Sequence, residues 1–119
     1  MNDRELLESA AKAAGRKYNV SRKTSSGWLL ATASLAPNDD IVEDDIWRPL
    51  QDDGDALRLA AKLGICIVFI EDNNSVAAEH SVHGVIAVET MGAIGTRRCI
   101  VRAAAEIEKT VNAPREVTP

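Results

Sequence analysis

The chain is poor in aromatic residues and in cysteine, and it has no long apolar run. Only 3% of its 119 residues are aromatic, and these are Tyr18, Trp28, Trp47 and Phe69. The core must therefore consist mainly of Ala, Leu, Ile and Val. The longest apolar run, Ile65–Ile70, is far shorter than the about 20 residues of a membrane-spanning helix. These scarcities exclude a disulfide-stapled toxin and predict no membrane association.

The two cysteines and the first residues predict the compartment. Cys66 and Cys99 each lie in an apolar segment, which predicts two buried free thiols in a reducing environment. Residues Met1–Glu5 have neither the basic nor the apolar stretch of a signal peptide. We therefore expect a cytoplasmic protein.

Linear catalytic and metal-binding motifs are also missing. The sequence has no Gly-x-Ser-x-Gly, no His-Glu-x-x-His and no Walker loop. The only histidines, His80 and His83, would point to opposite faces of a strand, and zinc needs three or four converging ligands. The acidic run Asp52–Asp55 lacks the further oxygen ligands of a calcium loop and fits a helix cap. We expect no enzymatic activity, no metal and no cofactor.

What the sequence does contain is an uneven charge distribution. The net charge is −4, yet eight acidic residues and one base lie between Asp39 and Asp55, a local net charge of −7. Five bases and no acid lie between Lys12 and Lys23. The acidic segment is either a solvated loop or a protein-binding surface that imitates the phosphate charge of nucleic acid. The acidic pI of about 5.1 argues against direct nucleic-acid binding.

Hydrophobic periodicity predicts three helices, over residues 3–14, 53–63 and 96–111. Asn2, Asp52 or Asp53, and Thr96 are candidate N-caps, while Gly15 and Gly64 are natural C-terminal stops. Residues 112–119 contain two prolines and no periodicity, so we expect a frayed tail.

Strand candidates lie between these helices. Residues 17–20 and 28–34 predict a hairpin around a polar turn, residues 21–27, and the acidic segment follows as a linker. Residues 65–70 are apolar on both faces, which predicts a central strand covered on both sides. Residues 76–80 and 82–90 predict a further hairpin. We expect one domain over residues 1–111, an α+β fold with a mainly antiparallel sheet of about four or five strands sandwiched by about three helices.

Three segments resemble the phage ABA sandwich domain family. They are ELL with AAKAAG at residues 5–15, WRPLQDDGDALRLAAKL at residues 47–63, and TRRCIVRAAAEI at residues 96–107. The resemblance implies a small phage or prophage protein with helices sandwiching a sheet, and it implies no catalytic residue. The stretch Lys17–Asp45 is longer than is typical of the family, so this insertion is where we expect a function particular to this chain.

Together, charge and resemblance favour a non-enzymatic phage accessory protein. We expect it to bind and inhibit a host protein of a bacterial antiviral defence system, such as a CRISPR complex, through its acidic surface. The candidate contact residues are five carboxylates, flanked by two bases and an aromatic residue. They are Asp39, Asp40, Glu43, Asp44 and Asp45, with Arg22, Lys23 and Trp28.

Two alternatives remain open. A glycine-containing turn that leads into a helix N-terminus presents free amides to an anion, and two arginines would add charge. This predicts a small-molecule binder, a sponge for a nucleotide immune signal, at Gly92, Gly95, Thr96, Arg97 and Arg98. The second alternative is self-assembly, in which an alanine-rich helix face or an exposed strand edge makes a homodimer.

Overall fold

The computed structural model describes residues 1–112, apart from the side chains of Val85 and Asn112. In this range the chain forms three α-helices, six strands and one short 3-10 helix. The helices are α1 (Asp3–Ala13), α2 (Asp53–Leu63) and α3 (Ala93–Asn112), and the 3-10 helix is η1 (Glu71–Asn73). The strands are β1 (Val20–Thr24), β2 (Gly27–Leu35), β3 (Ile41–Trp47), β4 (Cys66–Ile70), β5 (Ser75–His80) and β6 (Val85–Thr90). The predicted frayed tail lies outside the described residues, except for Asn112 at the end of α3.

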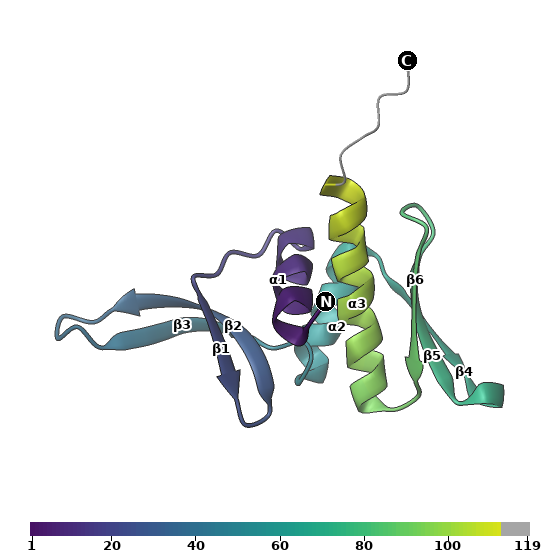
Figure 1. The fold of residues 1–119 in the computed structure, drawn as a ribbon, viewed down its shortest axis with the longest axis horizontal. Coiled ribbons are helices and arrows are strands. Elements are labelled where there is room, and N and C mark those ends of the chain that lie inside the picture. The colour runs from purple at the N-terminus through teal and green to yellow at the C-terminus, as the bar shows by residue number, and fades with distance from the viewer. Residues whose placement is uncertain (113–119) are drawn as a thin grey trace, which may run out of the picture.

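The strands form two separate antiparallel sheets, in the orders β1-β2-β3 and β4-β5-β6. The helices lie between them, with α1 against β2 and α3 against β5 and β6 (Figure 1). The predicted α+β class is therefore confirmed. The described strands number six rather than four or five, and they form two sheets that flank the helices.

The helix ends follow from local capping. The side chain of Asn2 accepts a hydrogen bond from the Glu5 amide at 2.9 Å, and Asp52 accepts one from the Asp55 amide at 2.9 Å. Gly64 ends α2 in the left-handed conformation, with φ 71°, which costs glycine little. The predicted cap at Thr96 is wrong: α3 begins at Ala93, and the Thr96 hydroxyl donates to the Gly92 carbonyl at 2.7 Å, one turn back.

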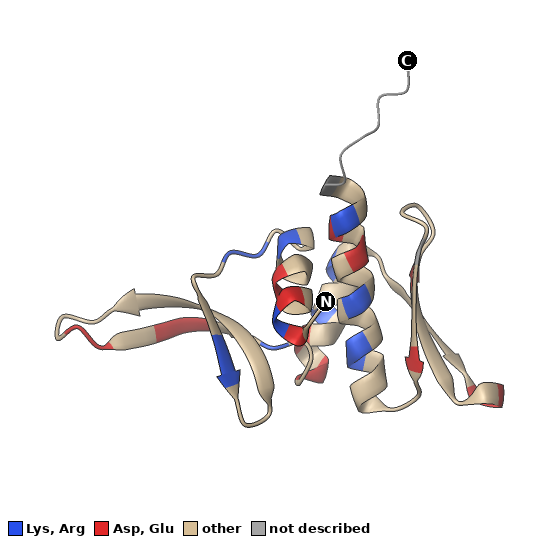
Figure 2. Ribbon diagram, viewed as in Figure 1, with Lys and Arg blue, Asp and Glu red and all other residues tan. Residues whose placement is uncertain are grey.

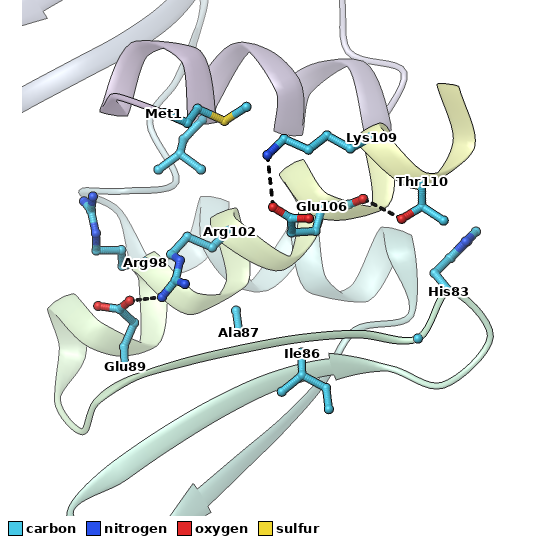
Figure 3. A pocket seen from close by; sticks show the side chains of 12 residues that line it. Met1, His83, Ile86, Ala87, Glu89, Arg98, Arg102, Glu106, Lys109 and Thr110 are labelled. Atoms are coloured by element: carbon cyan, nitrogen blue, oxygen red, sulfur yellow. Dashed lines mark hydrogen bonds and ion pairs between the residues drawn. The ribbon is translucent and has the colours of Figure 1, made fainter. Parts of the chain in front are cut away.

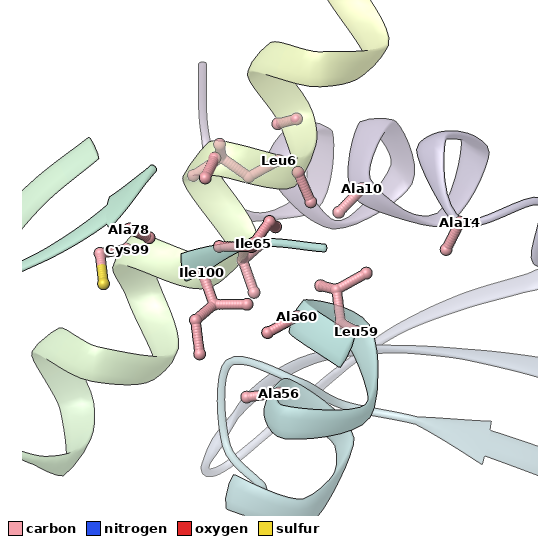
Figure 4. Close-up of a cluster of buried hydrophobic side chains, with 14 of the residues drawn as sticks. Leu6, Ala10, Ala14, Ala56, Leu59, Ala60, Ile65, Ala78, Cys99 and Ile100 are labelled. Atoms are coloured by element: carbon pink, nitrogen blue, oxygen red, sulfur yellow. The ribbon is translucent and has the colours of Figure 1, made fainter. Parts of the chain in front are cut away.

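The buried core is built mainly from small and aliphatic side chains where the three helices meet (Figure 4). Ala10, Ala11 and Ala104 are completely buried, and α1 packs extensively on α3. The first sheet contributes Leu30 and Trp47 to this cluster, and the second contributes Val76 and Ala78 among others. Trp47 covers the core and is 5% exposed, with the Arg16 guanidinium 5.5 Å from the centre of its ring.

Two strand predictions are wrong in the first sheet. The polar residues Ser21–Thr24 lie in β1, paired with Gly27–Leu30 of β2, so the turn is only Ser25–Ser26. The acidic segment is also not a linker, because Ile41–Trp47 forms β3 along β2. Charged residues are disfavoured in strands but are accepted at a solvent-exposed edge.

The apolar run is also misplaced by its sequence pattern. Residues 66–70 form β4, which in the described part of the chain is an edge strand paired with β5 alone rather than a central strand. Phe69 is 58% exposed and Val68 is 37% exposed. The apolar sequence pattern indicates the composition of a strand, whereas the position of the strand in the sheet depends on which strands it pairs with.

The two thiols differ in environment. Cys66 on β4 is exposed, so the prediction of two buried thiols is wrong for this residue, whereas Cys99 on α3 is buried as expected. The Cys99 thiol donates to the Thr96 carbonyl at 3.2 Å. Within residues 1–112 no helix combines the length and apolarity needed to cross a membrane.

We expect the buried thiol to weaken the fold at alkaline pH. Burial raises the pKa of Cys99 from 9.0 to about 11, so the unfolded chain loses this proton first as pH rises. The thiol therefore does not lower the free energy of unfolding below about pH 9. Between about pH 9 and 11 the free energy of unfolding falls, by at most about 2 to 3 kcal/mol. Urea unfolding at pH 8 and 10.5 checks this. The free energy of unfolding should fall less between the two pH values in Cys99→Ala than in the unaltered chain. An equal loss in both chains would contradict it.

Candidate functional site

The most prominent surface feature is the far end of the β2–β3 hairpin, which extends away from the helices (Figure 1). We call residues 33–46 the acidic arm. At its tip the Ala36 amide donates to the Asp40 carbonyl at 2.7 Å, and the Asp39 amide donates to the Ala36 carbonyl at 2.9 Å. Asp39 takes a positive φ of 67°, a conformation that Asp and Asn tolerate better than most residues. The tip is thus a hydrogen-bonded turn.

The five candidate carboxylates all lie on this arm, but they are not equivalent (Figure 2). Glu43 is ion-paired with Arg22, and Asp45 with Arg16. Asp39, Asp40 and Asp44 are exposed, and no ion pair to them occurs within the described residues. The Asp40 carboxylate accepts a hydrogen bond from the side-chain amide of Asn38 at 2.7 Å. Three of the five carboxylates are therefore available to an external cation.

Asp44 is held outward by a break in the strand pairing. Thr32 pairs with Asp45, and the next residue, Ala33, pairs with Glu43, so Asp44 is the extra residue of a bulge. Bulges bend an edge strand and change the direction of a side chain. This one places an unpaired carboxylate on the outer edge of the first sheet.

Exposed apolar side chains accompany the acids. Leu35 is 72% exposed and Ile41 is 60% exposed, and they face each other across the hairpin near its tip. Val42 is 47% exposed and Ile46 is 44% exposed. Large aliphatic groups grouped on a protruding hairpin are typical of an interaction surface. Sequence reasoning missed this component, although Ile41, Val42 and Ile46 are interspersed among the acids.

The rest of the acidic segment has structural roles. Asp52 caps α2, Asp53 pairs with Arg97 at 2.6 Å, and Asp55 accepts from the Arg48 amide at 3.0 Å. Asp55 also pairs with Arg58 at 2.7 Å. The run of eight acids thus divides into an exposed arm and a helix-capping group.

The predicted flanking residues are only partly near the arm. Arg22 reaches Glu43, but Lys23 pairs in register with Trp28 beside the β1–β2 turn, at the other end of the sheet from the arm tip. Trp28 and Leu35 are seven residues apart on β2, or about 24 Å at the usual rise per residue. Trp28 packs against the core, with the Arg4 guanidinium 5.7 Å from its ring. A partner on the arm tip would lie far from Lys23 and Trp28.

The segment proposed for anion binding is largely occupied by internal contacts. Gly95, Thr96, Arg97 and Arg98 lie inside α3, and Gly92 precedes it. The Arg97 guanidinium donates to the Leu50 carbonyl at 3.1 Å and pairs with Asp53, and Arg98 pairs with Asp3 at 2.8 Å. These pairs tie α3 to α2 and α1. Both arginine charges are therefore already compensated.

A cavity of about 640 Å³ lies between α3, β6 and the first residues of the chain (Figure 3). Its lining includes Arg98, Arg102, Lys109 and His83. Arg102 pairs with Glu89, and Lys109 pairs with Glu106 at 3.1 Å. The cavity is polar, but its three strong cations each have a carboxylate partner.

The two histidines meet, contrary to expectation. His83 lies in the turn after β5, where its amide donates to the His80 Nδ1 atom at 3.2 Å, and the ring centroids are 4.6 Å apart. The expectation of opposite faces is wrong because the turn folds back. Among the residues with described side chains, no group of three or more His, Cys, Asp or Glu is placed to hold a metal ion.

Comparison of the chain with protein-family models, with curated proteins and with solved structures gives no match in any of the three. The class of the protein therefore rests on its fold, a small α+β domain with an acidic hairpin arm.

Proposed function

We propose that this chain is a non-enzymatic binding protein that docks its acidic arm on a basic surface of another protein. The observation that carries the proposal is the arm's combination of exposed Leu35 and Ile41 with three exposed carboxylates, which have no ion-pair partner among the described residues. These carboxylates are Asp39, Asp40 and Asp44. Exposed like charges steer association and select a partner of opposite charge. The apolar groups supply the area that a stable contact needs.

The protruding geometry favours a concave partner. A hairpin that extends beyond the helices can enter a groove, and basic grooves are the surfaces with which proteins bind nucleic acid. The resemblance to a phage family suggests the source of such a groove. We propose a host protein with a nucleic-acid-binding groove, such as a component of an antiviral defence complex like CRISPR, which the arm would block.

We expect neutralising the arm to weaken partner binding about tenfold, because three exposed charges are each worth about 0.2–1 kcal/mol. The variant is Asp39→Asn/Asp40→Asn/Asp44→Asn, in which asparagine suits the positive φ at position 39. The matched control, Glu5→Gln/Asp72→Asn/Glu79→Gln, removes three acids outside the arm. Each chain is immobilised, and the bacterial proteins that it captures at physiological salt are compared.

The expected result is a protein that the unaltered chain and the control capture and that the arm variant loses. Equal capture by all three chains would refute the role of the arm. Equal loss in the control and the arm variant would show that net charge, and not the arm, governs binding.

A second candidate is the sponge for a nucleotide signal. One observation supports it: Arg98 lines the cavity beside α3, whose volume of about 640 Å³ suits a small ligand. Binding would require the nucleotide phosphates to displace Asp3 from Arg98. Calorimetry against cyclic and linear nucleotides separates the two functions, and the absence of heat with every nucleotide would dismiss this one.

A further inference from the structure

Strand β4 combines a central strand's composition with an edge strand's position. Its residues, Cys66–Ile70, carry no charge and no polar side chain other than a thiol, and within residues 1–112 the strand pairs only with β5. Figure 1 shows it at the margin of the second sheet, on the far side of β5 and β6 from α3. Its second row of backbone N–H and C=O groups therefore faces outward.

Proteins usually protect such an edge with a charge, a proline or a bulge. β4 has none of the three: its register with β5 is continuous from Cys66 to Ile70, and Pro and charged residues are absent from it. β3, an edge strand of the first sheet, carries three acids and a bulge. The contrast within one molecule indicates that β4 is left open for pairing.

Charges at the two ends of β4 identify a second copy of this chain as the partner. Antiparallel pairing centred on Val68 would place Cys66 opposite the second copy's Ile70. The ends of the paired strands would bring η1 of one copy, which carries Glu71 and Asp72, towards the end of α2 of the other, where Lys62 is exposed. Within the described residues none of these three charged side chains has an ion-pair partner. A two-fold axis would form the acid–lysine contact twice.

We propose that the chain forms a homodimer in which β4 pairs antiparallel with β4 of a second copy, joining the two second sheets into one six-stranded sheet. The pairing hydrogen-bonds the open backbone row and makes β4 central, as its composition predicts. It also joins the exposed side chains of Val68, Ile70, Ile86 and Val88 with their counterparts in one apolar surface. The acidic arm belongs to the other sheet, so the dimer does not depend on the proposed function.

A matched pair of lysine substitutions tests the pairing. Val68 and Val88 flank Ala77 in one cross-strand row and are 37% and 50% exposed, so both substitutions leave the core intact. Val68→Lys would place two like charges side by side at the two-fold axis, whereas Val88→Lys lies on the opposite edge strand. Sedimentation velocity from about 1 μM to about 1 mM measures the dimer constant of each folded chain.

The unaltered chain is expected to dimerise, Val68→Lys to weaken the dimer at least tenfold, and Val88→Lys to change it less than threefold. An unaltered chain that remains monomeric up to about 1 mM would overturn the proposal. Equal weakening by both lysines would also overturn it, since face-to-face stacking would then explain the dimer.

A charge reversal tests the partner's identity. Lys62→Glu alone and Glu71→Lys/Asp72→Lys alone are each expected to weaken the dimer, because each brings like charges together. The chain with all three substitutions is expected to recover most of the affinity, since both copies then carry the reversed pair. No recovery would overturn the proposed register.

Discussion

Gly95→Ala is expected to lower the free energy of unfolding by about 3 kcal/mol, equivalent to roughly 10 °C in melting temperature. Gly95 lies in the first turn of α3, where alanine would ordinarily stabilise a helix by about 1 kcal/mol. A Cβ atom at this position would overlap the carbonyl oxygen of Thr90 and contact the Glu89 side chain at 3.4 Å. The backbone of β6 cannot yield without moving the sheet, so the clash outweighs the helix propensity.

Gly54→Ala is the matched control in a second helix. Its Cβ would meet the flexible end of Arg58 at 3.1 Å and the Asp52 carboxylate at 3.3 Å, and the first of these can move aside. We expect a change within about 1 kcal/mol. Thermal unfolding of both variants checks the pair, and a Gly95→Ala chain as stable as the unaltered one would contradict the close approach of α3 to β6.

The helices could be predicted because their signals are local. Asn2, Asp52 and Gly64 act within one turn of the residues that they cap. The sequence predicts the start of α3 three residues too late, because Thr96 is a residue type that often caps helices but its hydroxyl donates to the Gly92 carbonyl, one turn earlier. Whether a threonine hydroxyl caps a helix or donates to a carbonyl one turn earlier depends on the local backbone geometry, which the sequence pattern does not determine.

The strand segments predicted at 28–34, 65–70, 76–80 and 82–90 correspond to β2, β4, β5 and β6. The places of strands within the sheets could not be predicted, because pairing partners are non-local. The acidic residues at 43–45 read as a linker, yet β2 supplies the hydrogen bonds that make them a strand. The apolar run at 66–70 read as central, yet the described chain ends the sheet there. In the proposed dimer β4 is a central strand, so the apolar pattern of residues 66–70 would predict its position in the dimer correctly.

For the candidate site, the sequence located the charge but not its partners. All five predicted carboxylates lie on one arm, but Asp45 is paired with Arg16, 29 residues earlier. Arg97 and Arg98 had the composition of an anion site and instead pair with Asp53 and Asp3, which are distant in sequence. Ion pairs between distant segments depend on the tertiary fold, so they could not be predicted from the sequence.

We expect the arm to be removable without loss of the fold. Replacing residues 33–44 with Asn-Gly would connect Thr32 to Asp45, which already face each other across the hairpin, through a two-residue turn of a favoured type. None of the removed residues belongs to the buried cluster, to which β2 and β3 contribute Leu30 and Trp47. The free energy of unfolding should change by less than about 1 kcal/mol, although the Arg22–Glu43 pair is lost.

Partner affinity of this shortened chain tests the binding role of the arm most directly. A protein captured by the unaltered chain is titrated with both chains in calorimetry, at low and at physiological salt, after their melting curves have been compared. We predict that the shortened chain melts as the unaltered chain does and binds at least about a hundredfold more weakly, because it lacks both the free acids and the apolar tip. Unchanged affinity in a folded, shortened chain would contradict the proposal.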